Sequence, residues 1–233
     1  MTATLQDVTM HAESLSAEQI INDIAGVSAA GSVCLTSSFQ TEDMIVLHLL
    51  RKQVPQVPVI FLETGYHFAP LIKYRDRIAR DWNLNLVNAL PRTSVAEHEA
   101  QFGLLHVINP TQCCQIRKVE PLMRSLEPYQ WWFTGLRREQ SPTRANLKKI
   151  EDHRLPGGKE MKKVSVIADW TWDRVQDYAR EHDIPRLSLY DEGYTSIGCE
   201  PCTARPEAGA DARSGRWGGR KLECGIHTFS EKR

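Results

Sequence analysis

The chain lacks an excess of charge of either sign, because 29 Lys and Arg balance 29 Asp and Glu and leave a formal net charge of +0. Without a net positive field, a protein has no general attraction for nucleic acid or for an anionic membrane surface. The sequence also lacks any apolar run that approaches the roughly 20 residues of a membrane-spanning helix. We therefore expect binding to neither nucleic acid nor membrane, although a local basic pocket for a small anion stays compatible with this balance.

The first residues lack the pattern of a secretory signal, in which basic residues precede an apolar segment. Residues 1–13 contain no Lys or Arg and no such apolar segment. We therefore expect a cytoplasmic protein, whose cysteines are kept reduced. Six cysteines in that compartment are expected to bind metal or to act as catalytic thiols rather than to form structural disulfides.

Short apolar stretches that favour β-structure alternate with helical patterns along most of the chain. Strands are predicted over residues 32–37, 57–62, 84–89, 129–134 and 164–167, and helices over 14–25, 44–52, 70–82, 117–126 and 169–181. This alternation indicates βαβ units and a mainly parallel sheet with helices on its faces. We predict an α/β fold of the Rossmann-like type for a nucleotide-binding domain over residues 1–204.

Beyond residue 204 the periodicity fades and glycine and basic residues become frequent. Such composition is typical of segments that cannot bury enough apolar surface to become ordered. The sequence therefore predicts a mobile C-terminal tail over residues 205–233 rather than a packed element.

Four of the six cysteines form two pairs, the adjacent Cys113 and Cys114 and the CxxC pair of Cys199 and Cys202. Two pairs of thiolates can complete the four-fold ligation of a metal centre. Adjacent cysteines would strain the tetrahedral shell of one zinc ion, whereas a cluster with several irons accepts neighbouring thiolates at different corners. The pattern favours an iron–sulfur centre, with zinc or simply buried free thiols as the alternatives.

Cys224 lies apart from these pairs, in a basic neighbourhood that includes Arg216, Arg220 and Lys221, with His227 three residues further on. Nearby positive charge lowers the pKa of a thiol and so increases the fraction of the nucleophilic thiolate. A reactive thiol is predicted here, and an ordinary exposed cysteine is the alternative. On a glycine-rich arm, such a thiol could close over a site and then swing out to meet a partner.

Two polar turns follow predicted strands, over residues 38–43 and 63–67. Ligands of parallel sheets bind beyond the carboxyl ends of the strands, where backbone N–H groups at helix N-termini attract anions. The first turn has neither a Walker lysine nor a GxGxxG pattern, so a plain βα turn fits it equally well. Both turns are candidate parts of one binding site.

Several longer motifs occur in one order along the chain, and together they resemble the assimilatory sulfonucleotide reductases, which act on adenylyl sulfate or phosphoadenylyl sulfate. The motifs are Ser37-Ser38-Phe39-x-x-Glu42-Asp43, Glu63-Thr64-Gly65, Cys113-Cys114-x-x-Arg117-Lys118, Thr134-Gly135-x-Arg137-Arg138-x-Gln140-Ser141, Ala168-Asp169-Trp170-Thr171, Tyr194-x-Ser196-Ile197-Gly198-Cys199-x-Pro201-Cys202-Thr203 and Glu223-Cys224-Gly225-Ile226-His227. One departure is Glu63, where many members carry aspartate.

The resemblance implies an adenine nucleotide alpha hydrolase-like fold with Cys224 as the nucleophile. It implies a [4Fe–4S] cluster held by Cys113, Cys114, Cys199 and Cys202. It also implies substrate contacts from the phosphate loop, the adenosine-binding segment, the basic residues around the phosphosulfate and the tail, namely Ser37, Ser38, Phe39, Thr41, Leu62, Thr64, Gly65, Lys118, Arg144, Arg213, Arg216 and His227.

The implied reaction is the reduction of adenylyl sulfate to sulfite and AMP through an S-sulfocysteine, as a step of assimilatory sulfate reduction toward cysteine. Thioredoxin or glutaredoxin is the expected electron donor, and a homo-oligomer is expected. Because cluster-bearing members usually prefer adenylyl sulfate, we favour it over 3′-phosphoadenylyl sulfate, which some of them also accept.

A zinc-binding ATP-pyrophosphatase or tRNA-thiolation enzyme is a weaker alternative, since the SGGxDS-type loop of such enzymes is absent from this sequence. A pure binding module is a third alternative, and activity that depends on Cys224 would exclude it.

Overall fold

The computed structural model describes residues 5–29, 31–219, 221 and 223–227. Its strands are β1 (Val33–Thr36), β2 (Pro58–Leu62), β3 (Asn85–Ala89), β4 (Trp131–Phe133), β5 (Ile150–Arg154) and β6 (Glu160–Val164). Its α-helices are α1 (Leu5–His11), α2 (Ala17–Val27), α3 (Thr41–Arg51), α4 (Ala69–Asp81), α5 (Val95–Phe102), α6 (Leu105–Ile108), α7 (Pro110–Cys114), α8 (Glu120–Leu126) and α9 (Trp172–Glu181).

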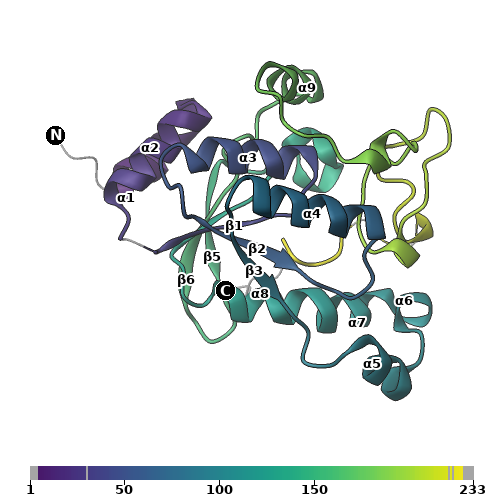
Figure 1. The fold of residues 1–233 in the computed structure, drawn as a ribbon. Helices are drawn as coiled ribbons and strands as arrows, with labels where there is room; N and C mark the ends of the chain where they lie inside the picture. The colour runs from purple at the N-terminus through teal and green to yellow at the C-terminus, as the bar shows by residue number, and fades with distance from the viewer. Residues whose placement is uncertain (1–4, 30, 220, 222, 228–233) are drawn as a thin grey trace.

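The six strands form one sheet in the order β3-β2-β1-β4-β6-β5 (Figure 1). All neighbouring pairs are parallel except β5 and β6, which are antiparallel. The chain builds outward from β1 to β3 and then returns to place β4 on the other side of β1. Strand order therefore reverses between β1 and β4, and open α/β sheets bind their ligands beyond the carboxyl ends of the strands at such a point. The predicted Rossmann-like, adenine nucleotide alpha hydrolase-like fold is confirmed.

The sheet is the middle of three layers, with α2, α3 and α4 on one face and α8 on the other (Figure 1). Side chains of a strand alternate between the two faces. Leu35 and Phe61 accordingly belong to the larger core with the helices α2 to α4, whereas Cys34 and Ile60 pack with Leu122 of α8. Burial on both faces explains why the central strands are continuous apolar runs in the sequence.

Thr171 is the N-cap of α9, because its hydroxyl accepts a hydrogen bond from the backbone N–H of Arg174 at 3.2 Å. The carboxylate of the neighbouring Asp169 instead forms an ion pair with Lys149 at 2.9 Å. The helix therefore begins at Trp172, three residues inside the predicted range, which started at residue 169. The cap satisfies one of the backbone donors that the first turn of a helix leaves without a partner.

The predicted strand over residues 164–167 is wrong in position, since β6 ends at Val164 and is preceded by the unpredicted edge strand β5. Ser165 donates its N–H to the carbonyl of Lys149 at 2.8 Å, one step beyond the last β5–β6 pair, and the chain then turns as Ala168 donates its N–H to the carbonyl of Ser165 at 2.9 Å. The apolar residues Val166 and Ile167 are buried in this turn rather than in a strand. The charged side chains of β5 and β6 weaken the alternating pattern that marks a strand in the sequence.

The prediction of a tail without packed structure is wrong for residues 212–217. Ala204 donates its N–H to the carbonyl of Gly215 at 2.8 Å, Thr203 and Arg216 form an antiparallel bridge, and Trp217 is 3% exposed. A buried indole and backbone hydrogen bonds supply stabilisation that an argument from composition overlooks. In Figure 1 this yellow segment lies on the side of the sheet where β2 ends. Its motion, and a domain boundary at residue 205, stay predictions.

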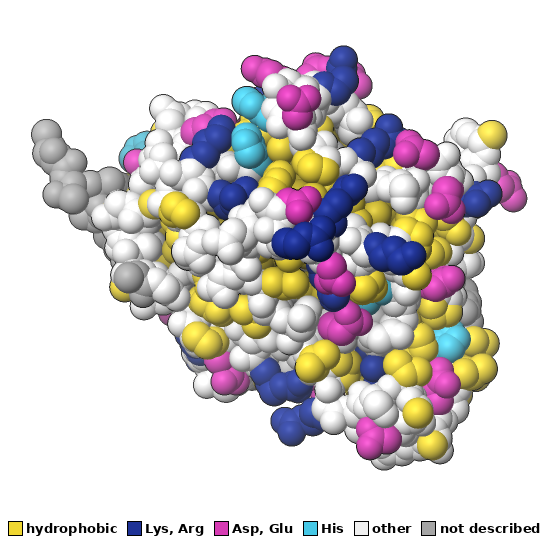
Figure 2. All heavy atoms as spheres, in the orientation of Figure 1, with side chains coloured by type: hydrophobic (Ala, Val, Ile, Leu, Met, Phe, Trp, Pro, Cys, Tyr) yellow, Lys and Arg dark blue, Asp and Glu magenta, His cyan; other side chains and the backbone are white. Residues whose placement is uncertain are grey.

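Positive and negative side chains are interspersed over the face drawn in Figure 2, as a net charge of zero leads one to expect. No helix within the described part of the chain is long and apolar enough to cross a membrane.

Candidate active site

A cavity of about 590 Å³ opens beyond the carboxyl ends of β1, β2 and β4. Its wall joins Thr36 and Leu62, at the ends of their strands, to Gly135 after β4 and to the C-terminal segment around Cys224. The cavity therefore lies where strand order reverses, and the tail closes one side of it. A cavity of this size is in the range of pockets that bind small molecules.

The turn after β1 is held by the carboxylate of Asp43. Ser38 donates both its backbone N–H and its hydroxyl to Oδ2, each at 2.6 Å, and Gly135 donates its N–H to Oδ1 at 3.1 Å. Phe39 donates its N–H to the hydroxyl of Ser37 at 3.0 Å and has a positive φ of 59°. The backbone donors of Ser38 and Phe39 are therefore used within the turn itself, and Ser37 and Ser38 line the cavity.

Asp43 also ties the first turn to the segment after β4. Burial raises the pKa of Asp43 to about 6, although the hydrogen bonds from Ser38 and Gly135 oppose that shift. A Cβ atom on Gly135 would collide with the Asp43 carboxylate, so only glycine permits this approach. The contact fixes the carboxyl ends of β1 and β4 relative to each other.

We expect Asp43→Asn to destabilise the protein, because the amide NH₂ would face the N–H of either Ser38 or Gly135. A buried donor without an acceptor costs about 1–3 kcal/mol. For a chain of this size, each kcal/mol lowers Tm by about 2–4 °C, which a thermal melt measures. Asp152→Asn is the matched control, since its side chain is 87% exposed and its ion pair with Lys162 lies at the surface. An equal loss of Tm in both variants would contradict the bridging role of Asp43.

The segment after β2 is held by Arg117, which is 3% exposed. Its Nε donates to the carbonyl of Thr64 at 2.7 Å, and a Cβ atom on Gly65 would come within 3.2 Å of the guanidinium. Gly65 has a positive φ of 77°, which suits glycine. The hydroxyl of Thr64 lies 3.3 Å from Sγ of Cys199, so this turn also contacts the CxxC loop.

The two cysteine pairs come together from distant elements. Cys113 and Cys114 end α7 and are followed by a π-helical turn over Gln115–Val119, a distortion that is frequent at functional sites. Burial and the charges of the other three thiols raise the pKa of Cys113 to about 12. Cys113, Cys114 and Cys199 are buried and Cys202 is half-buried, and the charges of the other three thiols oppose the ionisation of Cys113. A bound cationic centre would remove this opposition, because coordination deprotonates a thiol. The donor set therefore fits a metal centre.

No three His, Cys, Asp or Glu side chains of the described residues converge closely enough to hold one metal ion. Cys113 nevertheless interacts electrostatically with Cys114, Cys199 and Cys202. The cysteine pairs are therefore close enough to influence one another.

Lys118 connects the cysteine pairs with the tail. Burial lowers the pKa of this ammonium, but the charges of Cys199, Cys224 and Cys114 outweigh burial and raise its pKa above the ordinary value. Lys118 and Cys224 both line the cavity. The ammonium group of Lys118 therefore lies close both to thiols of the cysteine pairs and to the thiol of Cys224.

Arg216 approaches the same region from the tail and is 6% exposed. Its guanidinium lies 4.5 Å from the centre of the Trp217 ring, and a Cβ atom on Gly198 would collide with it. The glycine that precedes Cys199 thus makes room for a buried cation. Lys118 and Arg216 give this end of the cavity positive charge.

Arg144 and Arg213 meet a carboxylate from the tail. Arg144 donates from Nε and Nη2 to the two oxygens of Glu223 at 3.0 and 2.9 Å, and Nη2 of Arg213 lies 3.6 Å from the same carboxylate. Burial raises the pKa of Glu223, but the hydrogen bonds and charge of Arg144, with the charge of Arg213, lower it overall. Glu223 is a site residue that the sequence did not identify, although its place beside Cys224 was a signal.

His227 packs at the floor of this region. Its ring stacks on Trp132 at a centroid distance of 5.8 Å, and its carbonyl accepts a hydrogen bond from Lys163 at 3.1 Å. Burial, followed by the charges of Lys163 and Arg144, holds the pKa of His227 well below its ordinary value, so the imidazole is neutral. Its buried Nδ1 has no hydrogen-bond partner among the described residues.

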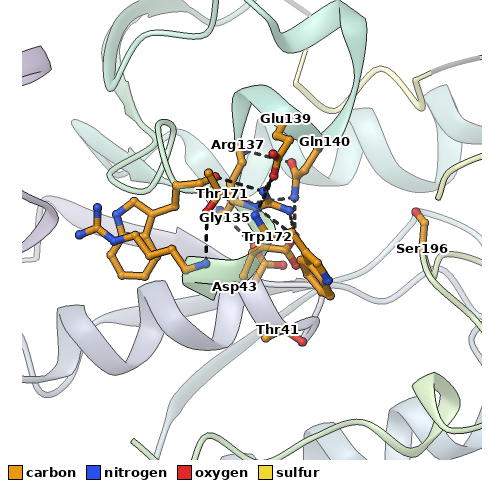
Figure 3. Close-up of polar contacts among 12 residues, drawn as sticks. Thr41, Asp43, Gly135, Arg137, Glu139, Gln140, Thr171, Trp172 and Ser196 are labelled. Atoms are coloured by element: carbon orange, nitrogen blue, oxygen red, sulfur yellow. Dashed lines mark hydrogen bonds and ion pairs between the residues drawn. The ribbon is translucent and has the colours of Figure 1, made fainter. Parts of the chain in front are cut away.

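A second group of polar residues gathers around Arg137, which is 4% exposed. Its guanidinium pairs with Glu42 at 3.0 Å and with Glu139 at 3.0 Å, and Gln140 donates to the Glu42 carboxylate at 3.0 Å. Figure 3 shows Arg137, Glu139 and Gln140 pointing toward one another, with Trp172 beside them. The sequence places Arg137 in one of the motifs that carry the resemblance, but it does not predict the pairing of Arg137 with Glu42 and Glu139.

Most of the predicted site residues share the cavity. Its wall includes Ser37, Ser38, Leu62, Thr64, Lys118, Arg144, Cys199, Arg213, Arg216, Cys224 and His227. The predicted residues that are not part of this wall are Phe39, Thr41, Gly65, Cys113, Cys114 and Cys202. The Phe39 ring instead packs edge-on against Phe61 in the core, at a centroid distance of 5.8 Å, and the N–H of Thr41 donates to the hydroxyl of Tyr190 at 3.3 Å.

Comparison with known proteins shows which family this sequence is similar to. A family model described as the phosphoadenosine phosphosulfate reductase domain matches residues 32–205. The adenosine 5′-phosphosulfate reductase of Streptomyces coelicolor is 45% identical over 196 residues, which cover 83% of this chain and 81% of that protein. The phosphoadenosine 5′-phosphosulfate reductase of Gloeobacter violaceus is 44% identical over 230 residues, covering 96% of this chain and 93% of that protein.

Solved structures are similar in fold. The crystal structure of phosphoadenylyl-sulfate reductase from Candida auris has a TM-score of 0.71 at 21% identity and covers 88% of this chain and 99% of its own. FMN adenylyltransferase from Candida glabrata, in complex with FAD and pyrophosphate, has a TM-score of 0.59 at 14% identity, with 99% and 81% covered. At these identities the likeness concerns the arrangement of strands and helices alone.

Proposed function

The chain belongs to the phosphoadenosine phosphosulfate reductase family, and from this premise we propose that it reduces adenylyl sulfate to sulfite and AMP. The observation that carries the proposal is the meeting of the Cys224 thiol with Lys118, Arg144, Arg213 and Arg216 on the wall of one cavity. A nucleophilic sulfur surrounded by cations suits attack on an anionic sulfate ester, because the cations offset the repulsion between two anions.

In the proposed first step, the Cys224 thiolate attacks the sulfate sulfur of the nucleotide. A sulfur–sulfur bond forms, the bond from sulfur to the bridging oxygen breaks, and AMP departs with that electron pair. Cys224 is left as an S-sulfocysteine. The surrounding cations would hold the sulfate and phosphate oxygens, and the buried unpartnered Nδ1 of His227 is available to a ligand atom.

In the second step, a thiolate of a dithiol donor such as thioredoxin or glutaredoxin attacks Sγ of Cys224. Sulfite departs with the electron pair of the sulfur–sulfur bond, and the donor is left in a mixed disulfide. The second donor thiol then releases Cys224, so the dithiol supplies both electrons as it becomes a disulfide. For this attack the tail must expose Cys224, which is the reason for proposing that the tail moves. A dithiol donor fits the reducing cytoplasm.

Cys113, Cys114, Cys199 and Cys202 would hold a [4Fe–4S] cluster, whose charge would act on the electrostatic field of the cavity. Lys118 interacts with Cys114 and Cys199 as well as with Cys224, and Thr64, in the turn after β2, contacts Cys199. A change at the cysteine pairs would therefore alter the position of Lys118 and of the turn after β2.

Sulfite release from the two nucleotides tests the proposal. We expect thioredoxin-dependent sulfite formation from adenylyl sulfate with a clearly higher kcat/KM than from 3′-phosphoadenylyl sulfate. Relatives named for each substrate are similar to this chain, so the comparison is needed. Comparable kcat/KM values would refute the preference, and no sulfite from either nucleotide would refute the activity. Anaerobic absorption and metal content should show a brown protein with about four irons per chain.

A further inference from the structure

The carboxylate of Glu223 binds to Arg144 and Arg213 at the cavity in the way that an oxyanion ligand would. Besides the two hydrogen bonds from Arg144, Oε1 accepts one from the hydroxyl of Thr143 at 3.1 Å, and Arg213 lies 3.6 Å from Oε2. The Glu223 side chain is only 14% exposed. A guanidinium fork with an added hydroxyl is a donor set that recognises carboxylate, sulfate and phosphate alike.

One guanidinium fork cannot bind the Glu223 carboxylate and an external oxyanion at the same time. Arg144 and Arg213 are two of the cations that we assign to the phosphosulfate. Arg144 and Arg213 are partly buried, with side chains 11% and 21% exposed, and neighbouring cations withdrawn from water are costly without an anion. The nucleotide-free cavity therefore gains stability from an internal carboxylate. Because Cys224 is the next residue, the same contact fixes the backbone that carries the nucleophile.

We infer that Glu223 is a positioning residue, an internal anion that holds Cys224 in the nucleotide-free cavity and is displaced when the sulfate group of the substrate binds. The inference rests on the proposed function for the identity of the displacing ligand. Displacement removes one anchor of the tail while Cys224 stays beside the bound sulfate. The arriving substrate thus weakens the tail contact that must open before the donor can reach the sulfonated cysteine.

The first test measures access to Cys224 without any nucleotide. The cluster-loaded protein is treated anaerobically with iodoacetamide, and modification of the Cys224 peptide is followed by mass spectrometry. The plateau of the pH profile gives the rate constant of the thiolate, which separates access from thiol pKa. We expect Glu223→Gln to raise this constant about tenfold, since hydrogen bonds to a charged group are lost.

Glu207→Gln is the matched control, because it removes the same charge from an exposed position of the tail and should leave the rate constant unchanged. Equal constants for Glu223→Gln and the unaltered protein would overturn the inference.

The second test measures competition, in a Cys224→Ser background that prevents turnover. Glu223→Gln should tighten the binding of adenylyl sulfate about tenfold by removing a competing charged contact, and should change the binding of AMP, which lacks the sulfate, much less. Unchanged or weaker binding of adenylyl sulfate would overturn the inference. If adenylyl sulfate and AMP bind neither to Cys224→Ser nor to the double variant with Glu223→Gln, the proposed function fails. The alkylation rates still decide whether Glu223 holds Cys224.

Discussion

Replacing Cys224 with serine is expected to abolish sulfite formation while leaving nucleotide binding and the iron content intact. A serine hydroxyl stays protonated near neutral pH and cannot form the sulfur–sulfur bond, so the rate should fall by at least about 10³-fold. The measurement is sulfite release from adenylyl sulfate with reduced thioredoxin, together with mass spectrometry of the chain after mixing with substrate. The unaltered protein should gain a sulfonate on the Cys224 peptide, and the serine variant should not.

Cys34→Ala is the matched control for this experiment. Cys34 is fully buried in the sheet, and burial raises the pKa of its thiol well above the ordinary value, so it cannot serve as a nucleophile. We expect the alanine variant to keep its activity. Sulfite formation by Cys224→Ser at an unchanged rate would refute the covalent mechanism.

Replacing Cys114 with serine is expected to prevent binding of the proposed iron–sulfur cluster and to lower thermal stability. Cys114 is 5% exposed and interacts with both Lys118 and Cys199, so its loss removes one ligand and disturbs the site that links α7 to the CxxC loop. Metal binding by residues that meet only in the folded chain contributes directly to folding free energy. Iron content, visible absorption and Tm measured anaerobically should therefore fall together.

Cys34→Ala again supplies the control, because it removes a buried thiol that is not part of either pair. Its iron content should match that of the unaltered chain. If Cys114→Ser retained about four irons per chain, the count for a [4Fe–4S] cluster, Cys114 would not be a ligand. A colourless protein rich in zinc would contradict the cluster itself.

The sequence by itself determined the class of fold, and it predicted the cysteines and the polar turns as parts of a site. Alternating apolar and helical segments were sufficient for a parallel sheet, because burial on both faces makes its central strands continuous apolar runs. The turns after β1 and β2 could be assigned to a site from their position alone, since parallel strands end at one edge. The two cysteine pairs and Cys224 were recognisable because each signal lies within a few residues.

Only the tertiary structure decided which charges meet. Arg144 and Glu223 are 79 residues apart in sequence and Arg137 and Glu42 are 95 apart, so no local spacing encodes these pairs. The hairpin of β5 and β6 was missed because its outward side chains are charged, and the packed part of the tail was missed because one buried Trp217 outweighs a flexible composition. Long-range pairing and burial depend on how distant segments cover one another, which is a property of the folded chain rather than of any window of its sequence.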